Sequence, residues 1–162
     1  MGFDLYGMNP VMREINEDKY PTYIFKEAKD ELEKTYYEEM TLREKENPGI
    51  YFRSNVWWWR RLWAFVCEHC YELTEEDYEH GSYNDCYEIS EEKASAIAKD
   101  LQEKINDGTA AHYENEINLA MEQAEKDEHG NPKEFNMMYP FSVGHLKDFI
   151  LFCSESGGFE IG

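Results

Sequence analysis

The chain has 162 residues, the size of one compact domain. It carries 16 Lys+Arg against 35 Asp+Glu, which gives a formal net charge of −19 with neutral histidines. Hydrophobic residues make up 41% and aromatic residues 15%, so the chain can build a core, which excludes a disordered acidic tail. The lack of a basic excess argues against direct binding to a nucleic-acid backbone.

Membrane insertion and export are not expected. No apolar run reaches the roughly 18–20 residues that span a bilayer. The first residues lack the cationic flank and apolar stretch of a secretory signal. Four unevenly spaced cysteines are too few for a disulfide scaffold, so we expect a reducing cytoplasm.

The first third of the chain predicts a strand, a connection and a helix. Residues 1–10 form an extended segment in which Phe3 and Leu5 share one side. Residues 11–21 predict a polar connection. Apolar residues at three-to-four spacing then predict a helix over residues 22–47.

A helix rich in tryptophan follows. Residues 50–53 are extended, and Ser54 or Asn55 can cap a helix that begins near Val56. We expect this helix to be the central one of the core. Its apolar stripe contains Val56, Trp59, Leu62, Trp63, Phe65, Val66 and Cys70.

The second half predicts further capped helices. Thr74 caps a short helix, Ser90 caps one that runs to residue 105, and Ser142 caps the last. Residues 109–128 predict another helix, residues 135–141 a loop or short strand, and residues 159–161 a final strand. The expected fold is mainly α (α+β). Residues 1–162 would form a single globular domain, a bundle of about five helices with a small sheet formed by the terminal segments.

Three stretches together carry a resemblance: GFDLYG at the start, YFRSNVWWWR in the middle and SGGF near the end. The set resembles a group of small proteins encoded by phages and by bacteria that carry mobile elements. The resemblance implies a phage-accessory setting in a bacterial host, without an activity. Acidic phage inhibitors of host defence, such as anti-CRISPR proteins, are analogous in size and charge.

The Cys67-Glu68-His69-Cys70 run invites a zinc interpretation. Zinc needs four converging ligands, and such a pair normally sits in a tight knuckle with a second pair elsewhere. Here the pair lies on a predicted helix, and the remaining candidates (His80, Cys86, His145, Cys153) form no second knuckle. We therefore predict buried structural thiols, with no metal and no cofactor.

Enzymatic motifs are absent from the sequence. There is no Gly-rich phosphate loop, nucleophile elbow or HExxH. Two His–Glu pairs, His112 with Glu116 and Glu76 with His80, stand one helical turn apart, a spacing that arises by chance on Glu-rich helices. We assign no catalytic residue and expect a non-enzymatic protein.

The strongest feature is an acidic segment, residues 72–92, which contains no Lys or Arg. A net charge of about 2–8 keeps a small domain soluble, so −19 exceeds that need. Carboxylates and tyrosines spaced along a surface suit electrostatic steering onto a basic groove, followed by aromatic anchoring. The expected partner-binding residues are Glu75, Glu76, Asp77, Tyr78, Glu79, Tyr83, Asp85 and Glu88.

Three functions remain open. The first is a binding protein that occludes a basic, nucleic-acid-binding surface of a host protein, as an anti-CRISPR or DNA-mimic inhibitor does. The second is a small-ligand or nucleotide-processing protein with a pocket built from Arg53, Asn55, Trp57, Arg60 and His69, since aromatic faces stack on bases and guanidinium pairs with phosphate. The third is a structural or assembly protein.

Overall fold

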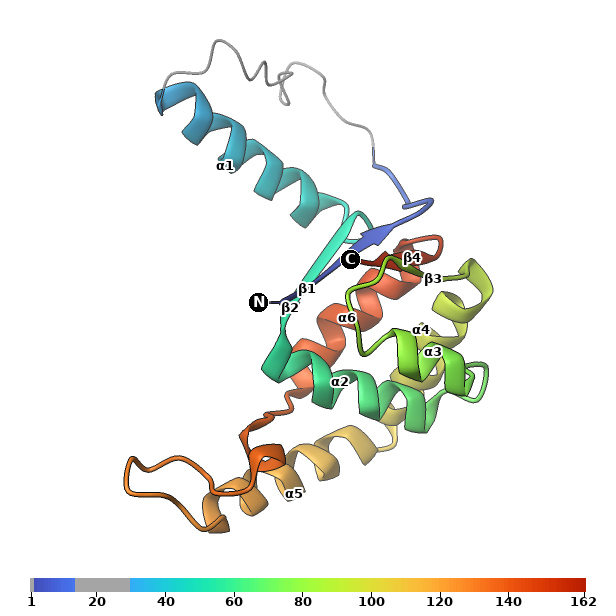
Figure 1. The fold of residues 1–162 in the computed structure, drawn as a ribbon. Helices are drawn as coiled ribbons and strands as arrows, with labels where there is room; N and C mark the ends of the chain where they lie inside the picture. The colour runs from blue at the N-terminus through green and yellow to red at the C-terminus, as the bar shows by residue number, and fades with distance from the viewer. Residues whose placement is uncertain (1, 14–29) are drawn as a thin grey trace.

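The computed structural model describes residues 2–13 and 30–162, with the side chains of the first helix described from Tyr37 onward. Figure 1 shows the fold. In chain order the elements are β1 (Gly2–Gly7), α1 (Asp30–Glu46), β2 (Tyr51–Asn55), α2 (Val56–His69), α3 (Glu75–His80), β3 (Tyr87–Ile89), α4 (Glu91–Asn106), α5 (Thr109–Gln123), the 3-10 helix η2 (Phe135–Met138), α6 (Val143–Glu155) and β4 (Phe159–Ile161).

The sheet has four antiparallel strands in the order β2-β1-β4-β3. The two ends of the chain pair directly, with Leu5 opposite Ile161. The predicted sheet between terminal segments is therefore confirmed, and β2 and β3 extend it on either side. Strand alternation turns Phe3 and Leu5 to the buried face, as expected.

Helices α2 and α6 pack against the sheet, and α4 lies beside both (Figure 1). The ring of Trp59 stacks on Phe3 and on Trp63, with centroids 5.3 Å apart in each pair. Both indoles are fully buried, which confirms α2 as the central helix. Burial of such large rings supplies much of the apolar area that stabilises the fold.

The helix boundaries follow the predicted caps. Asn55, Thr74, Ser90 and Ser142 each accept a backbone N–H from the first turn of the following helix. Helix α5 ends at Gln123, five residues before the predicted end at 128. Residues 135–141 contain η2 rather than a strand.

The mainly helical α+β class is confirmed, whereas a bundle of five helices is not. The described residues contain six α-helices, and α1 extends away from the others (Figure 1). None of its described side chains, from Tyr37 onward, is fully buried. The predicted helix over residues 22–47 matches α1 from Asp30, and its part before Asp30 lies outside the described residues.

A fully buried carboxylate, Asp77, connects three elements. Both of its oxygens lie 2.7 Å from Nζ of Lys93, at the start of α4. Thr74 donates its backbone N–H and its hydroxyl to Oδ2, and the Tyr87 hydroxyl of β3 donates to Oδ1 at 3.0 Å. Burial alone raises the pKa of Asp77, but these hydrogen bonds outweigh it and hold the pKa below its usual value.

The Asp77→Asn variant removes this charge while keeping the capping oxygen. Breaking a buried ion pair from one side costs about 3 kcal/mol, and we expect the free energy of unfolding in urea at pH 7 to fall by about that much. The exposed neighbour Glu76→Gln serves as the control, with an expected change within about 0.5 kcal/mol. Equal stability of Asp77→Asn and wild type at pH 7 would contradict the role of the pair.

The same ion pair predicts a pH dependence. The pKa of Asp77 is lower in the folded than in the unfolded chain, so its stabilisation is complete above the unfolded pKa of about 4 and is lost as the pH falls through the folded pKa. Asp77→Asn should lose this part of the acid dependence in urea titrations between pH 7 and pH 2.

Candidate functional site

The structure places the acidic segment on α3, the following turn and β3. Of the eight predicted partner-binding residues, seven are exposed: Glu75, Glu76, Tyr78, Glu79, Tyr83, Asp85 and Glu88. The prediction that Asp77 binds a partner is wrong. Asp77 points inward because its carboxylate caps α3 and neutralises Lys93, so it cannot contact a partner.

Two indole N–H groups fasten this segment to α2. Trp59 donates to the carbonyl of Gly81 at 2.7 Å, and Trp63 donates to the carbonyl of Tyr78 at 3.3 Å. A Cβ atom on Gly81 would lie 2.2 Å from the Trp63 ring, so only glycine allows this approach. Trp59 and Trp63 therefore belong to the core, and they also fix the position of the acidic segment.

The exposed carboxylates have little local compensation. Lys93 is engaged by Asp77, and Asp85 pairs with His80 at 2.6 Å, a hydrogen bond that raises the pKa of His80. Within the described part of the chain, no ion pair involves the other four carboxylates (Glu75, Glu76, Glu79, Glu88). In the sheet register Glu88 stands directly opposite Glu160, a like-charge pair that costs stability.

A pocket of about 430 Å³ lies between α2 and the start of α3. Its lining combines apolar surface from Ala64 and Leu73, the phenol of Tyr78, and two carboxylates at Glu68 and Glu75. This combination can receive a side chain with an apolar stem and a cationic head.

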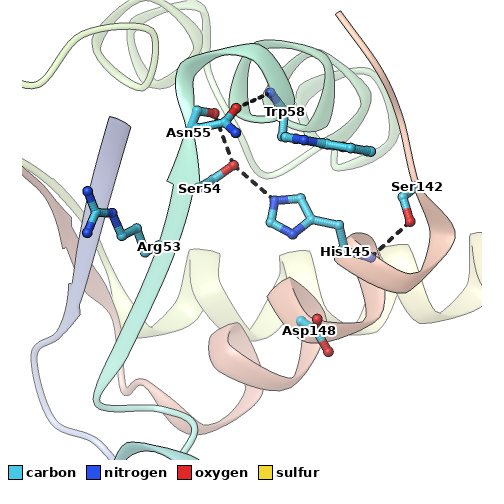
Figure 2. Close-up of a pocket in the computed structure, with 7 residues that line it drawn as sticks. All are labelled: Arg53, Ser54, Asn55, Trp58, Ser142, His145 and Asp148. Atoms are coloured by element: carbon cyan, nitrogen blue, oxygen red, sulfur yellow. Dashed lines mark hydrogen bonds between the residues drawn. The ribbon is translucent and has the colours of Figure 1, made fainter. Parts of the chain in front are cut away.

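A second pocket of about 350 Å³ lies where β2 passes into α2, facing the first turns of α6 (Figure 2). Its lining residues are Arg53, Ser54, Asn55, Trp58, Ser142, His145 and Asp148. Oγ of Ser54 lies 2.9 Å from Nε2 of His145, and this bond joins the strand to the helix. Burial lowers the pKa of His145, while the charge of Asp148 acts in the opposite direction.

The residues predicted for a nucleotide pocket do not converge. Arg53 and Asn55 line the second pocket, but the Arg53 guanidinium points away from His145 (Figure 2) and lies 3.6 Å from Asp4. Trp57 contacts Phe135 and Tyr139, Arg60 is exposed outside the pocket, and His69 lies against Phe65 at the far end of α2. The structure therefore does not bring these five residues together in one pocket.

The cysteines of the zinc-like run are buried or half-buried. Burial raises the pKa of Cys67 to about 12 and that of Cys70 to about 11, so both thiols are protonated at neutral pH. Cys153 is also buried, and Cys86 is exposed. In the described ranges no group of three or more His, Cys, Asp or Glu side chains is placed to hold a metal ion.

Sequence reasoning missed Ser54 and His145 as a pair. It treated Ser54 only as a possible cap and His145 only as a possible zinc ligand. A signal was present, because each is a polar residue at an inward position. Ser54 lies on the same inward side of the strand as Phe52, and His145 precedes Phe149 and Phe152 on one face of the helix.

Comparisons with known proteins give no match to a family model, a curated protein or a solved structure. Among the described helices, none combines the length and apolar character needed to cross a membrane.

Thiol reactivity tests the cysteine geometry. Thiolates are the reactive form, so we expect iodoacetamide at pH 8 to modify Cys86 rapidly in the folded protein and to leave Cys67, Cys70 and Cys153 unmodified. Peptide mass spectrometry reads the modified positions, and Cys86→Ser should abolish the fast phase. Fast modification of Cys67 or Cys70 would contradict the buried, protonated state.

Proposed function

We propose that this chain is an acidic binding protein that occludes a basic, nucleic-acid-binding surface of another protein. The observation that carries the proposal is a set of exposed carboxylates on a segment held by Trp59 and Trp63, four of which form no ion pair within the described ranges. Glu75, Glu76 and Glu79 project from α3, and Glu88 follows on β3. Uncompensated charge of one sign raises the rate of encounter with an oppositely charged surface.

The α2–α3 pocket supplies the anchor for this contact. A lysine or arginine side chain of the partner would lay its methylene stem on Leu73 and Tyr78, with its charged end between Glu68 and Glu75. Tyr78 and Tyr83 are about half exposed or more, at 49% and 60%, and rigid aromatic side chains of this kind favour interfaces. Steering and anchoring thus come from the same segment.

The proposed setting follows from the resemblance to small phage proteins. It is the cytoplasm of a bacterial host, with a nucleic-acid-binding host protein as the partner. Occlusion by carboxylates in place of phosphates is the manner of a DNA mimic or an anti-CRISPR inhibitor. The acidic character of the surface supports this proposal. An acidic surface repels the nucleic-acid backbone, so nucleic acid does not occupy the face that would contact the partner.

Affinity capture from bacterial lysate tests the proposal with two matched variants. The first replaces Glu75, Glu76, Glu79 and Glu88 by Gln, and the control replaces the same number of exposed carboxylates elsewhere: Glu103, Glu116, Glu122 and Glu128. We expect wild type and control to retain a nucleic-acid-binding protein at 50 mM salt and to release it at 0.5 M, and the first variant to lose it at both. Equal recovery of the protein by both variants would contradict the proposal and show that the acidic segment only keeps this protein soluble.

The anchor is tested by Tyr78→Ala once the captured protein is purified. We expect its dissociation constant to rise about tenfold or more with an unchanged salt dependence, because truncation removes apolar contact and leaves the charges in place. The Gln variant should instead flatten the salt dependence. The Tyr78 carbonyl that accepts the Trp63 N–H is retained in Tyr78→Ala, so α3 should keep its position. Unchanged affinity would exclude the pocket as an anchor.

A further inference from the structure

Ser54 and His145 form a hydrogen-bonded pair in the lining of the second pocket. Ser54 is 3% exposed and occupies an inward position of β2, one residue before the cap of α2. His145 lies in the first turn of α6, with its ring 5.2 Å from Phe52 and 6.0 Å from Trp58 between centroids. Contacts with these two rings restrict the imidazole, and its Nε2 is directed at Oγ of Ser54 (Figure 2).

The contacts of the Ser54 hydroxyl favour transfer of its proton to the imidazole. Its oxygen lies 2.9 Å from Nε2 of His145 and 3.3 Å from the carbonyl oxygen of Asn55. The shorter contact is to the nitrogen. Burial lowers the pKa of His145 and favours the neutral imidazole, and in the tautomer protonated at Nδ1 the lone pair of Nε2 can accept the hydroxyl proton.

Two further groups of the pocket suit the charges that such a transfer creates. Asp148 follows His145 by one turn of α6 and lines the same pocket, so its charge stabilises an imidazolium. The Oδ1 atom of Asn55 accepts the N–H groups of Trp57 and Trp58, at 3.1 Å each, which fixes the amide. Its Nδ2 group has no acceptor among the described residues and can donate to a developing oxyanion.

We propose that Ser54 is a nucleophile activated by His145, and that the pocket accepts small uncharged esters. Oγ attacks the carbonyl carbon while Nε2 takes the hydroxyl proton, and the tetrahedral oxyanion accepts the Asn55 amide N–H. His145 then returns the proton to the departing alkoxide, which leaves as an alcohol and yields acyl-Ser54. Water attacks this ester with His145 as base, releasing the carboxylic acid and restoring the Ser54 hydroxyl.

The preference for uncharged substrates follows from the electrostatics. The charged side chains that line the pocket are Arg53, which is turned toward Asp4, and Asp148. The net charge of −19 repels anionic substrates at a distance. The indole of Trp58 provides an apolar wall for an acyl or aryl group. This inference does not depend on the acidic segment or on the proposed function.

Labelling with an alkyl fluorophosphonate tests the nucleophile. Oγ forms a bond to phosphorus, fluoride leaves, and the proton passes to His145, so the adduct mass appears on the peptide that contains Ser54. We expect one equivalent on wild type and on the control Ser154→Ala, an exposed serine of α6. Ser54→Ala should remain unlabelled. His145→Gln should react at least about 100-fold more slowly than wild type, because a general base usually contributes that much.

A second measurement does not need His145→Gln, and it applies if circular-dichroism melts show that this variant is unfolded. Incubation with p-nitrophenyl acetate should give a stoichiometric burst of nitrophenol with acetyl on Ser54. Three outcomes would overturn the proposal: no phosphonyl or acetyl group on Ser54 above the Ser54→Ala background, modification of another residue in its place, or equal labelling rates for folded His145→Gln and wild type.

Discussion

The buried carboxylate of Asp77 sets the geometry of the acidic half of this protein. A carboxylate removed from water is stable only when cations and hydrogen-bond donors replace its hydration, and here Lys93, Thr74 and Tyr87 do so. These donors come from the cap of α3, from β3 and from α4, so one charge holds three elements together. The same contact engages Lys93, whose side chain is 29% exposed. Lys93 therefore does not pair with the exposed carboxylates of the acidic segment, which makes the negative surface a consequence of how the fold is held.

The Ser54–His145 pair differs from Asp77 in one physical respect. Every oxygen of Asp77 is surrounded by donors of the chain itself, so nothing outside can reach it. The serine and histidine, in contrast, both line a pocket that is open to solvent. A small molecule from solvent can therefore approach the Ser54–His145 pair through the open side of the pocket.

Local patterns predicted most of the fold. Helix caps at Asn55 and Thr74 and the apolar stripe of α2 were visible because they depend on residues close together in the sequence. The pairing of the two chain ends was also predicted from their alternation. Strand β3 was not predicted, because its three residues lie within the acidic segment and pair only with β4. The inward orientation of Asp77 and the meeting of Ser54 with His145, 91 positions apart, depend on tertiary contacts that a linear pattern does not record.

The length of α2 keeps the two proposed activities separate. The second pocket meets α2 at Trp58, and the α2–α3 pocket begins at Ala64. At 1.5 Å per residue these two positions are about 9 Å apart along the helix axis. This distance is close to the Debye length of about 8 Å at physiological salt, so exposed charges at one pocket are partly screened at the other. The two pockets share no lining residue, so each activity can be lost without the other.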